Sequence, residues 1–154
     1  VVVVVVDSLV AAPPTPVTIS QGIDWVSNGG NPSTVTVFEN GTAIDGGMLG
    51  TAHLSLTGPA DIAATPYELT SVRYCLSDTA GTVAEVSIVG LGNEIPGDPE
   101  EGTAETKDTT DRTSAGCFTI VADEEVASRQ AHHLMLVAIG EVQVAEVTAT
   151  WTAA

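Results

Sequence analysis

The chain has 154 residues, 44% of them hydrophobic, and its 20 acidic against four basic residues give a formal net charge of −16. This length suits one ordinary domain with a core of its own. So acidic a surface repels phosphate backbones and anionic lipid headgroups, which argues against nucleic acid or an anionic membrane as partner. Two interpretations remain: a soluble extracellular or salt-adapted protein, or an acidic surface that recruits a basic partner.

The N-terminal segment begins with six valines, Val1, Val2, Val3, Val4, Val5 and Val6. Valine is β-branched and favours extended backbone, so this run predicts one β-strand. The strand is apolar on both faces and therefore needs burial on both. Pro13, Pro14 and Pro16 follow it and predict an extended tether. We therefore divide the chain into a strand with its tether, residues 1–16, and a domain, residues 17–154.

Strand and turn signals alternate through the first half of the domain. We expect a strand at 17–19 that continues in 23–26, and further strands at 35–38, 42–44 and 49–56. Asn40-Gly41 is the strongest two-residue hairpin signal, because a type I′ turn needs left-handed backbone at both positions. A single helical turn is expected at 61–64.

The second half repeats this pattern. Strands are expected at 67–76, 82–89, 116–121, 133–139 and 142–151. The run 133–139 is apolar on both faces and predicts a central strand, whereas a slip of phase between Val144 and Val147 predicts a β-bulge. The segment 90–114 is polar and acidic, which predicts a long exposed loop. The charged bend at 123–125 favours a short helical turn.

Eight or nine short strands without an amphipathic helix of normal length predict an all-β fold. The expected architecture is an antiparallel β-sandwich, immunoglobulin-like or jelly-roll, preceded by the extended N-terminal strand.

Cys75 and Cys117 are the two cysteines, and an even pair in a chain of extracellular character predicts one disulfide. The apolar phase of the neighbouring residues places both thiols off the core face. This differs from the immunoglobulin bridge, which joins two sheets through the core. The alternative is a pair of free thiols or metal ligands, although no histidine pair accompanies them.

The sequence offers candidate residues for one glycosylation site and one calcium site. Asn40-Gly41-Thr42 fits the glycosylation sequon, which makes Asn40 a candidate acceptor, although a turn alone explains the same residues. The 90–114 segment offers hard oxygen ligands for calcium, although their spacing matches no EF-hand and a solvated acidic loop is the alternative. These candidate ligands are Asp98, Glu100, Glu101, Glu105, Asp108 and Asp111.

Nothing in the sequence indicates an enzyme. His132 and His133 are adjacent, so on a strand they point to opposite faces and cannot bind one metal together. The sequence has no nucleophile-elbow motif that would mark a catalytic serine, and no signature of the paired carboxylates of a glycosidase. His53 is likewise part of no recognisable catalytic motif. We therefore expect no catalytic activity, and no cofactor other than the calcium considered above.

A terminal strand that needs complete burial, carried on a tether, resembles the donor strand of β-sandwich subunits in extracellular filaments and pili. In that family a terminal extension of one subunit completes the sheet of the next. The resemblance covers only the N-terminal segment and rests on no specific motif, and the valines lack the alternation of a typical donor strand. It implies a non-enzymatic structural subunit that joins head to tail with copies of itself. The alternative for the segment is that it folds back onto its own domain.

The alternative function is a secreted binding or adhesion module, or a virion decoration or capsid-associated protein. Such a module would recognise a carbohydrate or protein of a host or cell surface, with Trp25 as the candidate contact or, alternatively, a core residue. The first residue is not methionine, which predicts export through a cleaved signal peptide to an extracellular or cell-surface location. No segment approaches the roughly 20 apolar residues of a membrane-spanning helix.

Overall fold

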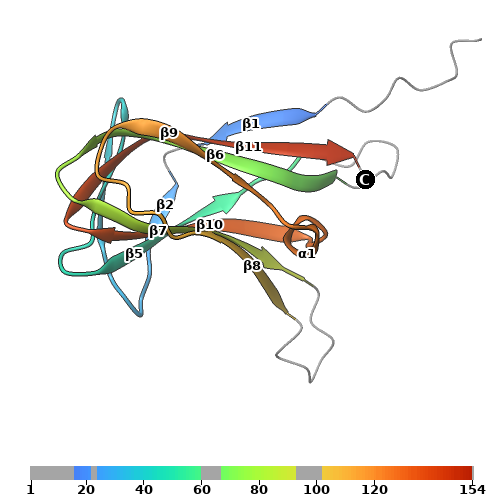
Figure 1. The fold of residues 1–154 in the computed structure, drawn as a ribbon, viewed down its shortest axis with the longest axis horizontal. Coiled ribbons are helices and arrows are strands. Elements are labelled where there is room, and N and C mark those ends of the chain that lie inside the picture. The colour runs from blue at the N-terminus through green and yellow to red at the C-terminus, as the bar shows by residue number, and fades with distance from the viewer. Residues whose placement is uncertain (1–15, 22–23, 60–66, 93–101, 154) are drawn as a thin grey trace, which may run out of the picture.

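The computed structural model describes residues 16–21, 24–59, 67–92 and 102–153. Two antiparallel sheets pack face to face in this part of the chain (Figure 1). The predicted antiparallel β-sandwich is thereby confirmed. It contains eleven strands in the described residues, rather than eight or nine.

Sheet A has β11 and β6, each of 13 residues, at its centre. Its strands are β1 (Val17–Gln21), β3 (Thr34–Phe38), β4 (Gly41–Asp45), β6 (Tyr67–Thr79), β9 (Gly116–Val121) and β11 (Glu141–Ala153). They follow the order β3-β4-β11-β6-β9, and β1 also pairs with β11. The phase slip predicted in the last strand is confirmed as a register shift between Val144 and Glu146, where β11 pairs with β6.

Sheet B has the order β2-β5-β10-β7-β8. Its strands are β2 (Trp25–Ser27), β5 (Gly50–Leu56), β7 (Thr82–Leu91), β8 (Thr103–Asp108) and β10 (Ala131–Ile139). β10 lies in the middle, as its apolar sequence predicts. One short helix, α1 (Glu124–Ala127), confirms the predicted helical turn, and the side chain of Asp123 caps it by accepting a hydrogen bond from the backbone N–H of Val126.

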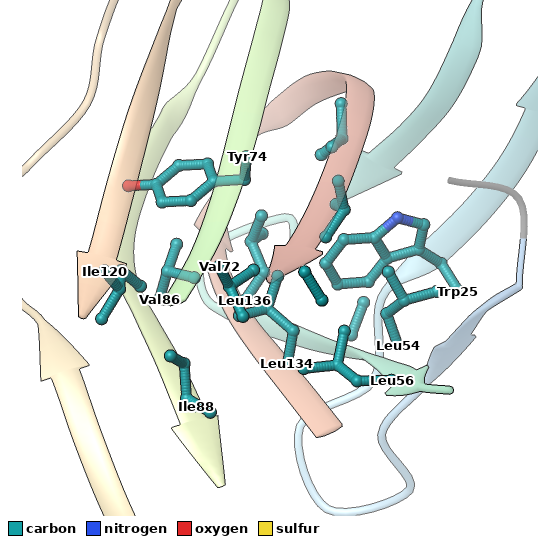
Figure 2. Close-up of a cluster of buried hydrophobic side chains, with 14 of the residues drawn as sticks. Trp25, Leu54, Leu56, Val72, Tyr74, Val86, Ile88, Ile120, Leu134 and Leu136 are labelled. Atoms are coloured by element: carbon teal, nitrogen blue, oxygen red, sulfur yellow. The ribbon is translucent and has the colours of Figure 1, made fainter. Parts of the chain in front are cut away.

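The core lies between the two sheets, because alternate residues of each strand point inward. Leu134 and Leu136 of β10 belong to the same buried cluster as Val72 and Tyr74 of β6 (Figure 2). Burying one such side chain stabilises the fold by about 1.5–3 kcal/mol. Both sheets supply fully buried residues, so the described sandwich has a core of its own.

The predicted hairpin at Asn40-Gly41 forms, but its turn lies one residue earlier. Phe38 pairs with Gly41, so Glu39 and Asn40 make the two-residue turn and Gly41 begins β4. Gly41 has a φ of 149°, and a Cβ atom there would collide with the backbone of Val144. Glycine is therefore required at this position by its conformation and by the close approach of the β11 bulge.

Two other predictions were wrong in part. The 90–114 segment is not one loop, because β7 extends to Leu91 and β8 occupies Thr103–Asp108. The inward residues of β8 include Ala104 and Thr106, which are too small or polar to reveal a strand. Residues 23–26 do not continue the strand at 17–19, since β1 belongs to sheet A and β2 to sheet B. The helical turn expected at 61–64 and the valine strand lie outside the described residues.

Candidate functional site

Cys75 and Cys117 form a disulfide between neighbouring strands of sheet A. They are direct register partners on β6 and β9, with Cα atoms 4.1 Å apart. Neither belongs to the core cluster, whereas Tyr74 and Phe118, one position away, contact it. The predicted disulfide and its place off the core face are confirmed, and free thiols or cysteine metal ligands are ruled out.

Asn40 and Trp25 lie in opposite environments. Asn40 is exposed in the turn between β3 and β4, and its glycosylation stays a prediction. Trp25 is only 5% exposed and belongs to the core (Figure 2). Of the two alternatives for Trp25, a core residue is therefore correct and a ligand contact is not. Its buried ring cannot stack against a sugar.

The candidate calcium ligands do not converge within the described residues. Asp98, Glu100 and Glu101 lie outside them. Lys107 pairs with Glu105 at 3.1 Å, and Asp111 is exposed. In the part of the chain that the structure describes, no three His, Cys, Asp or Glu side chains are placed to share a metal ion.

Asp108 instead belongs to a polar cluster beside β9. Its carboxylate accepts hydrogen bonds from the Tyr74 hydroxyl at 3.1 Å and from Arg112 at 3.0 Å. The Arg112 guanidinium lies 4.0 Å from the centre of the Phe118 ring, a cation–π contact. This cluster joins β6 and β9 of sheet A to β8 of sheet B.

Burial and hydrogen bonding shift the pKa values in this cluster. Burial raises the pKa of Tyr74 to about 12. Burial alone would also raise the pKa of Asp108, but hydrogen bonds from Thr110 and Arg112 hold it below its usual value. The pair therefore carries a neutral phenol and an ionised carboxylate, an arrangement that stabilises the structure.

The histidines occupy both faces of β10, as the sequence predicts. His132 points inward, is 4% exposed, and its Nε2 lies 2.6 Å from the carbonyl of Val126. His133 points outward, with its ring centre 4.9 Å from that of His53 on β5. Burial lowers the pKa of all three. All three therefore favour the neutral form.

The most distinctive feature of sheet A is the arrangement of strands along one side of β11. β6 pairs with one side of β11 along almost its whole length. β4 and β1 share the opposite side: β4 pairs with residues 141–144 and β1 with residues 147–151. Both run antiparallel to β11, so β1 and β4 follow one another along the same line.

Outside β1 and β4, the next strand position of sheet A is occupied along only half of its length. β3 pairs with β4 and ends at Phe38, opposite Gly41. Continued past Phe38, β3 would run beside β1, but the chain turns back at Glu39 instead. No described strand pairs with this outer edge of β1. We use the term β1 edge for the outer side of Val17–Gln21, together with the half-exposed side chains of Val37 and Phe38 next to it.

Sequence reasoning did not find the β1 edge. It depends on which strands flank β11, and the pair Val17 and Trp151 is separated by more than 130 positions in the sequence. The one available signal was that Val37 and Phe38 are large apolar residues directly before a turn.

No family model matches this sequence, and no curated protein matches it either. The described part of the chain has no helix with the length and hydropathy needed to cross a bilayer.

Proposed function

We propose that this protein is a structural subunit of an extracellular filament or surface assembly, and that it polymerises by inserting Val1–Val6 into a neighbouring copy. The observation that carries the proposal is that the described residues already form a sandwich with a core from both sheets. The six valines, which the sequence predicts to be a strand, would then be additional to this sandwich. Leaving each valine in water forgoes about 1.5 kcal/mol or more, which favours burial against another surface.

The tether gives this strand its reach. Residues 7–16 connect it to β1 and, at about 3.3 Å per extended residue, would reach roughly 30 Å if fully extended. Three prolines in this stretch favour extended backbone over a compact return. A tether of this length would allow the strand to reach a second copy.

The proposed extracellular location rests on the disulfide, and the proposed mode of assembly on the net charge. One disulfide is formed, and disulfides persist in oxidising compartments. The net charge of −16 makes non-specific association of copies unfavourable, so assembly requires a directed contact such as strand addition. A binding module is less well supported, because Trp25, its candidate contact, is buried.

Deleting residues 1–6 tests the proposal. We expect filaments of the intact chain in negative-stain images, and a folded monomer of the truncated chain by light scattering and circular dichroism. A matched control replaces the six valines by threonines, which keeps the length and the β-branched shape but removes half of the methyl groups. This control should also remain monomeric. Filaments of the truncated chain, or a monomeric intact chain at high concentration, would refute the proposal.

A further inference from the structure

We infer that the β1 edge is the acceptor that receives Val1–Val6 of a neighbouring copy. This inference rests on the proposed function and goes further, because it names the strand that the incoming segment pairs with. The incoming strand would continue the line of β3 beyond Phe38 and lie beside Val17–Gln21. It would fill the half of that line which the described chain leaves without a strand.

The edges of sheet B are poor acceptors. β2 has only three residues, and a strand this short offers few backbone groups. β8 carries Glu105, Lys107 and Asp108, and Lys107 forms ion pairs with both Glu85 and Glu105. Charged side chains on an edge strand disfavour the addition of another strand.

The outer strands of sheet A are also less suitable. β9 is uncharged, but its inward residue Phe118 is covered by the guanidinium of Arg112. A valine strand added there would have its inner face next to this cation. β3 is already two strands from β11, so a strand beside it would lie further from the centre of the sheet than one beside β1.

The β1 edge suits a strand that is apolar on both faces. Val17 and Ile19 are half-buried, and Ile19 packs against the core from the inner face. Val37, 53% exposed, pairs with the buried Thr42 and so shares the inner face, whereas Phe38, 50% exposed, lies on the outer face. Successive valines point to alternate faces and would cover both Val37 and Phe38. On the outer face the apolar contact would come from Phe38 alone, since Thr18 and Ser20, the outward residues of β1, are polar and exposed.

The acceptor strand is held in place before any partner arrives. Gln21, at the end of β1, joins sheet A to β5 of sheet B through hydrogen bonds with Ser55 and Thr57. β1 is also paired with β11 over all five of its residues. The incoming strand therefore meets a formed edge, and its addition requires no opening of the sandwich.

Disulfide trapping between two copies tests this assignment. One variant carries a cysteine in the donor segment, Val3→Cys or, in a second preparation, Val4→Cys, since neighbouring valines point to opposite faces. The other variant carries Thr18→Cys on β1 or, as a matched control, Thr119→Cys on β9. Both threonines are exposed residues of edge strands. The two variants are mixed, allowed to assemble, oxidised and separated on a non-reducing gel.

We expect covalent dimers with Thr18→Cys at several-fold higher yield than with Thr119→Cys. Equal yields, or a preference for Thr119→Cys, would refute the β1 edge as acceptor and leave the filament proposal standing. A chain carrying both Val3→Cys and Thr18→Cys that cross-links only within itself would refute the acceptor in favour of a folded-back strand. An intact chain that forms no filaments would refute the proposed function itself.

Discussion

The side-chain amide of Gln21 donates a hydrogen bond to the backbone carbonyl of Ser55 at 3.1 Å. Its side-chain carbonyl accepts one from the backbone N–H of Thr57, also at 3.1 Å. β2 pairs with β5 only as far as Leu54, so these two backbone groups lie just beyond the end of β2. One side chain from sheet A thus takes the place of a strand at the edge of sheet B.

Replacing Gln21 by alanine should lower the free energy of unfolding by about 1 kcal/mol, because two backbone groups lose their partners. Urea denaturation followed by circular dichroism measures the change. Gln21→Glu is the matched control: it keeps an acceptor for Thr57 but loses the donor to Ser55, and should also destabilise the fold. An unchanged transition midpoint in both variants would show that water replaces the side chain without cost.

Gly41→Ala should destabilise the protein by at least about 2 kcal/mol, since the new Cβ atom would meet the backbone of Val144 in a conformation unfavourable for alanine. Gly29→Ala is the matched control, because a Cβ atom there has nothing within 4 Å. Thermal unfolding should separate the two variants clearly. Equal melting temperatures would mean that β4 and the β11 bulge are not in close contact.

Replacing both Cys75 and Cys117 by alanine should cost about 4 kcal/mol on the chain-entropy model, given their separation of 42 residues. The fold itself should persist, because neither residue belongs to the core cluster. Urea unfolding of the variant, beside wild type with and without reductant, measures the effect. Wild type under reducing conditions should match the variant, and a reduced protein as stable as the oxidised one would contradict the prediction.

His132 should make stability depend on pH. Burial lowers its pKa, so the folded chain takes up the proton only below the pH at which the unfolded chain does. The free energy of unfolding is therefore unaffected by the titration of His132 above about pH 6.5. Below that pH the unfolded chain is protonated first, and the free energy of unfolding falls by up to about 1.4 kcal/mol per pH unit.

His132→Gln removes this titration and keeps a side-chain donor for the carbonyl of Val126. Urea unfolding between pH 8 and pH 5 should show a shallower loss of stability in this variant than in wild type. The more exposed His133 provides the comparison: His133→Gln should change the slope less. An identical slope in wild type and His132→Gln would show that the buried imidazole is not the titrating group.

The fold class could be predicted because its signals are local. Alternation in the strands that contain Val72 and Val147 sets their buried face, and the same phase places Cys75 and Cys117 outside the core cluster. The hairpin before Gly41 depends on neighbouring residues alone. Each of these features is determined within a few positions of the chain.

The candidate site could not be predicted, because it depends on distant pairing. The exposure of Val37 follows from where β3 ends relative to β1, and that relation depends on the register of both with β4 and β11. β8 was missed because pairing with β7, rather than the hydrophobicity of Ala104 and Thr106, holds it in the sheet. Trp25 has no sequence signal that separates a core ring from an exposed one.

β1 both continues the tether and borders the inferred acceptor, and this has a mechanical consequence for a polymer. Tension arriving through the inserted strand of one copy would leave through the tether of the next after crossing only Val17–Gln21. The other strands of the sandwich would carry no tension. Stretching such a fibre would therefore load the pairing between the inserted strand and β1 first, and would leave the β1–β11 pairing, the Gln21 contacts and the residues enclosed by the disulfide intact.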